Sequence, residues 1–157
     1  MSTRSQVIIQ DGPKDRVFFY RHSDGYPSGA GLSLVQFLKR FIGPVTDPKV
    51  LRRDATQASG HLVLHGREEY VDLIKSDSYA WKVGAYEPCT NKLFGDIEWL
   101  YIIDFETNTF KVYQTGFDFG KRQKTTETRI KQSKLVYETT ITAEGLIDAQ
   151  LKLKELE

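Results

Sequence analysis

Cysteine, long apolar runs and net charge are all scarce in this chain, and each scarcity excludes a class of protein. The single cysteine, Cys89, rules out an intramolecular disulfide, which fits a reducing compartment. No run of about 18 apolar residues occurs, and the first residues hold no apolar stretch of signal-peptide length. We therefore expect a cytoplasmic protein that does not cross a membrane.

The charges nearly cancel, because 22 basic and 21 acidic side chains leave a net charge of +1. A protein that coats nucleic acid through charge alone carries a basic excess. We therefore expect no non-specific nucleic-acid binding, although a local basic patch such as Lys121-Arg122-Gln123-Lys124 stays open. With 157 residues, 39% apolar and 27% charged, the composition is typical of one globular domain spanning residues 1–157.

The apolar runs and turn residues predict an α+β fold. Apolar runs at 7–9 and 16–20 flank an Asp-Gly-Pro turn and predict a β-hairpin. Further strands are expected at 79–86, 96–105, 109–114 and 133–141. Because most of these strands follow one another through short turns, the sheet should be mostly antiparallel, with about five to six strands.

Two or three helices should pack on one face of this sheet. The first follows residue 31 and ends at Gly43-Pro44, since proline cannot continue a helix. The second begins at Asp47-Pro48, although Gly60 weakens the prediction of an unbroken helix. The third begins after Thr142, whose hydroxyl caps it. Helical spacing gives the second helix a buried face formed by Leu51, Ala55, Ala58, Leu62 and His65.

Polar side chains and glycines are densest in residues 21–31, between the second strand and the first helix. Glycines let backbone N–H groups approach a ligand, and a helix start favours an anion such as phosphate. Arginine adds a bidentate contact, and aromatic rings stack on a base. The alternative is turn chemistry alone, with a carboxylate capping backbone amides. The ligand-binding hypothesis names Arg21, His22, Asp24, Tyr26, Gly29, Gly31 and Trp81.

Two of these residues are also candidates for acid–base catalysis. Histidine side chains commonly act as acids and bases near neutral pH, which makes His22 a candidate, and Asp24 would orient its ring if the strand continued that far. The alternative is a structural hydrogen bond between the two side chains. The run ending in Arg21-His22 resembles the histidine phosphatase signature, but Ser23 stands where that signature has glycine and the predicted topology differs, so we reject that activity.

Acidic side chains at 96 and 98 suggest a metal site as an alternative. On a strand, Asp96 and Glu98 would point to the same face and could hold Mg²⁺ or Mn²⁺, with Glu87 or His22 completing the site. The alternative is a solvent-facing strand. His61 and His65 also share one helix face, with Glu68 or Glu69 as a third ligand, but a partly buried histidine is the better explanation of that spacing. No cofactor is expected otherwise.

Three blocks together resemble a family of small, uncharacterised proteins of bacteria and bacteriophages. The blocks are Arg21 to Pro27 with Gly29 and Gly31, Trp81 to Pro88, and Gly95 to Tyr101. The resemblance covers residues 7–112 and implies a role in phage–host or defence biology.

Three functions follow from these observations. The first is binding of a phosphate-bearing small molecule, such as a nucleotide signal, at residues 21–31. The second is a metal-dependent phosphoester hydrolase that uses Asp96, Glu98 and His22. The third is an inhibitor that binds a host protein. No nucleophile accompanies His22, so binding is favoured over catalysis, and an exposed edge strand would permit a homodimer.

Overall fold

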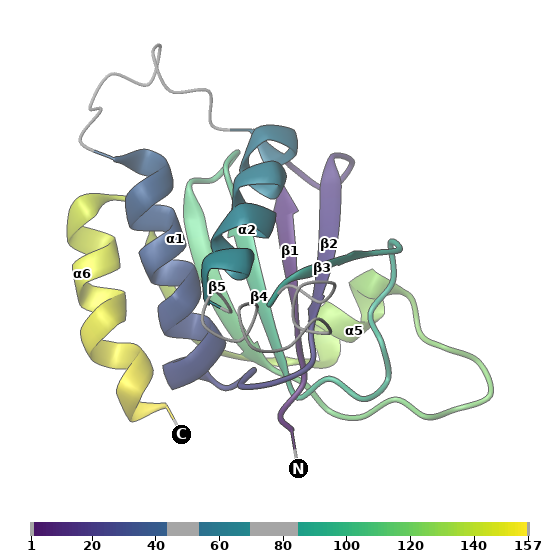
Figure 1. The fold of residues 1–157 in the computed structure, drawn as a ribbon. Helices are drawn as coiled ribbons and strands as arrows, with labels where there is room; N and C mark the ends of the chain where they lie inside the picture. Colours follow the sequence, from purple (N-terminus) through teal and green to yellow (C-terminus); the bar gives the residue numbers. More distant parts are fainter. Residues whose placement is uncertain (1, 44–53, 70–84, 157) are drawn as a thin grey trace, which may run out of the picture.

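A computed structural model of the chain describes residues 2–43, 54–69 and 85–156, which contain one six-stranded sheet (Figure 1). The strand order is β3-β2-β1-β4-β5-β6. Only the β1–β4 pair is parallel among the described strands, so the prediction of a mostly antiparallel α+β fold is confirmed. The strands are β1 (Ser5–Gln10), β2 (Arg16–Arg21), β3 (Glu87–Cys89), β4 (Trp99–Asp104), β5 (Thr109–Gln114) and β6 (Lys134–Thr140).

Three helices cover one face of the sheet, as the sequence predicts. Figure 1 shows α6 (Ala143–Lys152), α1 (Leu32–Ile42) and α2 (Ala55–Glu69) side by side across that face. The short helix α5 (Thr126–Gln132) lies against the opposite face, where its Ile130 contacts the second apolar cluster. None of the helices in the described ranges is long and apolar enough to cross a lipid bilayer.

Each face of the sheet carries its own apolar cluster. The larger cluster lies under the three helices and includes Val7, Ile9, Phe19, Leu34 and Leu38. The smaller cluster consists of Ile8, Phe18, Leu93, Ile97, Leu100 and Ile102. Every residue of β1 is buried, because β1 lies between β2 and β4 and both of its faces are covered.

Several predicted boundaries are confirmed. The hairpin joins β1 and β2 through a turn in which Gly12 has a φ of +83°. Helix α1 ends at Ile42, and Gly43 follows with a φ of +53°. The Thr142 hydroxyl accepts a hydrogen bond from the Gly145 amide at 3.0 Å and caps α6, as its position predicts.

Other expectations need correction or lie outside the described residues. Strand β4 begins at Trp99 rather than at residue 96, so Asp96 lies in a turn and does not alternate with Glu98 along a strand. Helix α5 was not predicted. The expected start at Asp47-Pro48 and most of the strand at 79–86 fall outside the described residues. Within them, Ala85 and Tyr86 precede the short strand β3.

Candidate functional site: a groove between α1 and α2

A buried ion pair joins β2 to α2 beneath the helices. Strand alternation places Phe19 and Arg21 on the helix-covered face, and Arg21 is only 4% exposed. Its Nη1 atom donates to Glu69 Oε2 at 3.0 Å and to Oε1 at 3.3 Å. Its Nε atom donates to the Ser23 carbonyl at 2.8 Å, and its guanidinium lies 5.1 Å from the centre of the Tyr86 ring. The charge of Arg21 is therefore matched inside the protein.

Ser33, near the start of α1, extends this pair into a network. The Tyr86 hydroxyl donates to Ser33 Oγ at 2.7 Å, and Ser33 in turn donates to Glu69. Ser33 Oγ also lies 3.4 Å from His65 Nε2. Burial raises the pKa of the Tyr86 hydroxyl, so this group stays protonated and keeps donating. The Ser33 hydroxyl thus accepts from Tyr86 and donates to Glu69, so it links the two side chains.

His65 links the network to the surface. Burial lowers the pKa of its imidazole and favours the neutral ring, although the nearby Glu69 carboxylate acts in the opposite direction. Its Nδ1 atom lies 3.3 Å from Arg40 Nη1, a donor that cannot accept, so we infer that the neutral ring carries its proton on Nε2. That nitrogen faces Glu69 Oε1 at 3.7 Å.

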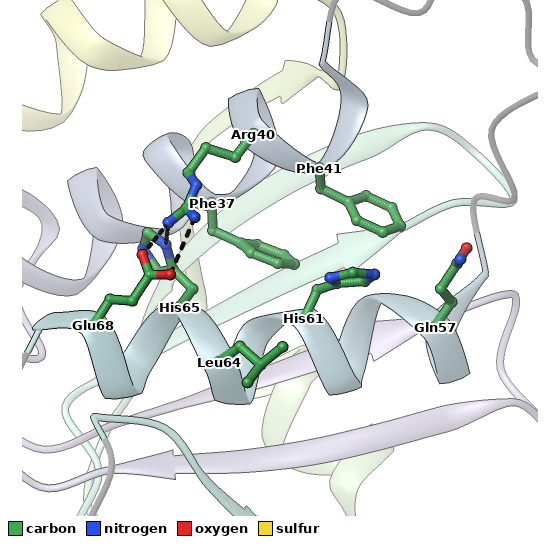
Figure 2. Close-up of a pocket in the computed structure, with 8 residues that line it drawn as sticks. All are labelled: Phe37, Arg40, Phe41, Gln57, His61, Leu64, His65 and Glu68. Carbon is green, nitrogen blue, oxygen red and sulfur yellow. Dashed lines mark hydrogen bonds and ion pairs between the residues drawn. The ribbon is translucent and has the colours of Figure 1, made fainter.

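A groove of about 340 Å³ lies above His65, between α1 and α2 (Figure 2). Figure 2 shows the rings of Phe37 and Phe41 descending from α1 toward the ring of His61 on α2. The Phe37 and Phe41 rings are stacked, with centroids 5.8 Å apart and planes at 21°. The His61 ring lies 5.7 Å from Phe41 at 54°. Gln57 and Leu64 complete the lining, and Leu64 is 62% exposed.

Arg40 lies at one end of the groove and is the cation that reaches it from α1. Its Nη1 atom donates to Glu68 Oε2 at 2.6 Å, and both side chains of this ion pair are largely exposed. The Glu68 contact raises the pKa of Arg40 and the Arg40 contact lowers the pKa of Glu68, so both groups stay charged. A second hollow adjoins here and adds Lys39 and Gln36 to the lining. The groove thus combines an aromatic wall with a cationic end.

The predicted spacing of His61 and His65 on one helix face holds, since both line the groove. Their use as metal ligands does not follow from this arrangement. Arg40 occupies the position next to His65 Nδ1, and a guanidinium repels a metal ion. Within residues 2–43, 54–69 and 85–156, no three His, Cys, Asp or Glu side chains are grouped so that they could hold a metal.

The loop at 21–31 uses its amides internally. The Gly25 amide donates to the Thr3 carbonyl at 2.9 Å, and the Ala30 amide donates to the Asp24 carbonyl at 2.7 Å. Residues Pro27–Gly31 form a single π-helical turn that runs straight into α1. A Cβ atom at Gly29 would lie 2.4 Å from the Asp24 carbonyl oxygen. These contacts explain the glycines by close packing, and the ligand-binding role of the loop stays a prediction.

The remaining residues of the ligand-binding hypothesis are dispersed. Gly31 packs against Leu153 of the turn η2 (Leu153–Glu155), where a Cβ would lie 3.2 Å from Cδ1. Tyr26 donates to Asp24 Oδ1 at 3.2 Å, and Asp24 has a φ of +55°. Because β2 ends at Arg21, strand alternation does not bring Asp24 to His22. Trp81 lies outside the described residues.

His22 and the predicted metal-binding carboxylates lie toward the other face of the sheet. The Tyr20 hydroxyl lies 3.3 Å from His22 Nδ1. Burial raises the pKa of Tyr20, with the Asp96 carboxylate and, more weakly, Glu87 adding to the shift. Asp96 itself pairs with Arg4 at 3.3 Å. Glu98 is placed by its backbone, whose amide donates to the Arg4 carbonyl at 2.9 Å. The hydrolase hypothesis stays a prediction.

Sequence reasoning singled out Arg21, His61 and His65, but it missed the aromatic wall of the groove and the partners of the buried network. Phe37 and Phe41 read as ordinary core positions of an apolar helix, and nothing in the sequence indicates that α2 leaves their edges open. The sequence did indicate that Arg21 needs a carboxylate partner, since an arginine on a buried strand must have its charge matched. Ser33 and Arg40 had no such signal, because their contacts depend on how α1 and α2 pack.

Comparisons with models of protein families, with the curated proteins and with the solved structures find no match for this chain. The resemblance to small bacterial and bacteriophage proteins therefore stays a prediction, and the function is argued from the groove itself.

Proposed function

We propose that this protein is a cytoplasmic binding protein for a small planar molecule with an anionic group, of the nucleotide class. The observation that supports the proposal is the groove between α1 and α2, where the Phe41 and His61 rings and the Arg40 guanidinium line one hollow of about 340 Å³. Ligand pockets typically have volumes of about 300–1,000 Å³, apolar walls and a few polar groups.

The roles follow from the chemistry of the lining. A base or similar ring stacks against Phe41 and His61, since offset and edge-on contacts between rings are favourable. A phosphate pairs with Arg40, whose planar fork matches two phosphate oxygens. The existing ion pair of Arg40 with Glu68 is exposed on both sides, so it is weak and a phosphate can replace the carboxylate.

The buried network supports the groove from below. His65, held by Ser33 and Glu69, fixes one wall and contacts Arg40, so the guanidinium is positioned before a ligand arrives. Among the described residues that line the groove there is no serine or cysteine, which favours binding over catalysis. In a phage or bacterial setting, such a protein would sequester or sense a nucleotide signal.

Calorimetric titration with a panel of mononucleotides and cyclic nucleotides tests the proposal, and the matching nucleosides serve as ligands without phosphate. We expect a nucleotide to bind and its nucleoside to bind more weakly. Arg40→Ala should weaken nucleotide binding by tenfold or more, because a charge-assisted hydrogen bond is lost. Phe41→Ala should weaken nucleotide and nucleoside alike.

Tyr26→Ala is the matched control, since it removes an aromatic ring from the 21–31 loop and leaves the groove intact. Nucleotide binding that survives Tyr26→Ala but not Arg40→Ala places the ligand in the groove. Loss through Tyr26→Ala alone would move the site to the loop. No heat with any member of the panel would remove the nucleotide proposal.

A further inference from the structure

Two phenylalanines project from the connection between β5 and α5. Phe117 is 60% exposed and Phe119 is 76% exposed, although large apolar side chains are usually buried. Their rings are stacked, with centroids 5.5 Å apart and planes at 19°. In Figure 1 this green connection extends away from the sheet before it reaches α5. The exposed rings therefore form a small aromatic platform on the surface.

The platform is held by buried contacts. Asp118, which separates Phe117 from Phe119 in the sequence, is only 8% exposed, and its amide donates to the Gly95 carbonyl at 2.9 Å. Its carboxylate accepts from the Lys124 amide at 3.2 Å. On the other side, Arg129 Nη2 donates to the Gly116 carbonyl at 3.2 Å. These hydrogen bonds fix the backbone on both sides of the two phenylalanines and thereby hold their rings at the surface.

The exposed charges within residues 115–124 have one sign. Lys121, Arg122 and Lys124 follow the rings and are all exposed, whereas the carboxylate of Asp118 is buried. Asp96, which lines a hollow together with Phe119, is 37% exposed and pairs with Arg4. The outer surface of residues 115–124 thus offers two aromatic rings and three cations, with no exposed carboxylate.

We propose that this surface, formed by Phe117, Phe119, Lys121, Arg122 and Lys124, binds single-stranded nucleic acid. Bases stack on exposed aromatic rings whatever their identity, and neighbouring cations follow the phosphate backbone. A membrane surface fits less well, because binding to anionic lipid typically uses clusters of about four to eight basic residues. The patch is local, which agrees with the balanced charge of the whole chain. This proposal is independent of the nucleotide groove.

Fluorescence anisotropy of a labelled dT oligonucleotide of about 12 nucleotides tests the proposal, with the same sequence as a duplex for comparison; sites on single strands span about 4–16 nucleotides. We expect the wild-type protein to bind the single strand more tightly than the duplex. The double variant Phe117→Ala/Phe119→Ala should lose at least tenfold in affinity. The control is Ile147→Ala/Leu151→Ala, which removes two exposed apolar side chains from α6 and should change nothing.

The cations are tested through salt. Replacing Lys121, Arg122 and Lys124 with serine should weaken binding and reduce the slope of log affinity against log salt by about 2, since each phosphate contact on a single strand contributes about 0.7. The Ile147→Ala/Leu151→Ala control should keep the slope of the wild-type protein. Unchanged affinity in the double phenylalanine variant would overturn the proposal, as would wild-type protein that ignores the oligonucleotide but sediments with phosphatidylserine vesicles.

Discussion

Arg21 lies beneath α2 at 4% exposure, where a guanidinium without a carboxylate is costly. Glu69→Gln removes the negative charge and leaves the arginine buried. We expect this substitution to lower the free energy of unfolding by about 2 to 3 kcal/mol, somewhat less than for a fully buried pair because the Glu69 side chain is 25% exposed. Urea denaturation at neutral pH measures the change.

Glu68→Gln is the matched control for this substitution. Glu68 precedes Glu69 on the same helix, but its ion pair with Arg40 has both side chains about 60% exposed, at 59% and 60%. Exposed pairs contribute little to stability, so this variant should unfold at nearly the wild-type urea concentration. Equal losses in the two variants would show that Arg21 does not depend on Glu69.

The buried imidazole of His65 makes the stability of the folded protein depend on pH. Burial lowers the pKa of its imidazole in the folded protein, so below about pH 6.5 the unfolded chain binds more protons than the folded chain. The contribution of His65 is complete above that pH and is lost as the pH falls toward the lowered folded pKa. The groups facing the ring are Ser33, Glu69, Arg40 and Glu68.

Chemical denaturation of the wild type and of His65→Gln between about pH 8 and pH 5 measures this contribution. The wild type should lose more stability than the variant over that range, because glutamine does not titrate. Parallel curves would mean that the imidazole has the same pKa in both states. At this scale the sequence predicts the buried position of His65 from helical spacing, but not the partners that α1 supplies.

At the scale of elements, α2 holds two glycines with opposite roles. Gly60 is exposed, and a Cβ added there would meet nothing within 4 Å. At Gly66 a Cβ would lie 2.9 Å from Tyr86 Cδ2 and 3.0 Å from the Tyr86 amide nitrogen. Gly60→Ala should therefore stabilise the protein by up to about 1 kcal/mol, whereas Gly66→Ala should destabilise it by about 1 kcal/mol or more.

Thermal unfolding followed by circular dichroism measures both alanine variants on one helix. The two midpoints should move in opposite directions from the wild type. If both rise, Tyr86 can move away from α2 without cost, and the close packing at Gly66 is not needed.

Elements with strong local signals were predictable, and those fixed by distant partners were not. Gly43 ends α1 and Thr142 begins α6 through contacts within a few residues, so the sequence shows them. The first residue of β4 depends on pairing with β1, where Ser5 lies opposite Trp99. The apolar pattern alone therefore extended that strand to Asp96. Helix α5 is short and polar, and its burial depends on Arg129.

At the scale of the whole molecule, Arg129 connects α5 to two loops on the sheet face that carries the smaller apolar cluster. It is 4% exposed and donates to the carbonyls of Phe94 at 3.1 Å and Gly116 at 3.2 Å. Arg129→Met keeps the length of the side chain but leaves these carbonyls without a donor. We expect a loss of about 3 kcal/mol in stability.

Hydrogen exchange followed by mass spectrometry locates the effect of Arg129→Met. Amides at 93–98 and 116–124 should exchange faster, while those of α1 and α6, on the other face, should keep their protection relative to global unfolding. Uniform acceleration across both faces would show that the two apolar clusters unfold as one unit.

The whole sheet was predictable in its class but not in its strand order. Short turns predict the antiparallel pairs β1–β2 and β4–β5, because the paired strands are neighbours in sequence. The parallel β1–β4 pair joins residues far apart, and no local pattern records it. The groove depends on the same long-range packing, since α1 and α2 lie over the sheet that this pair completes (Figure 1).

The place of β1 between β2 and β4 has a consequence during synthesis. Its six residues are all buried in the finished sheet, yet its partner β4 begins only at Trp99. At translation rates of about 5–20 residues per second, the nascent hairpin waits several seconds with the backbone N–H and C=O groups of one β1 edge unpaired. Through that interval the unpaired backbone edge of β1 is the part of the emerging chain most prone to pair with another strand.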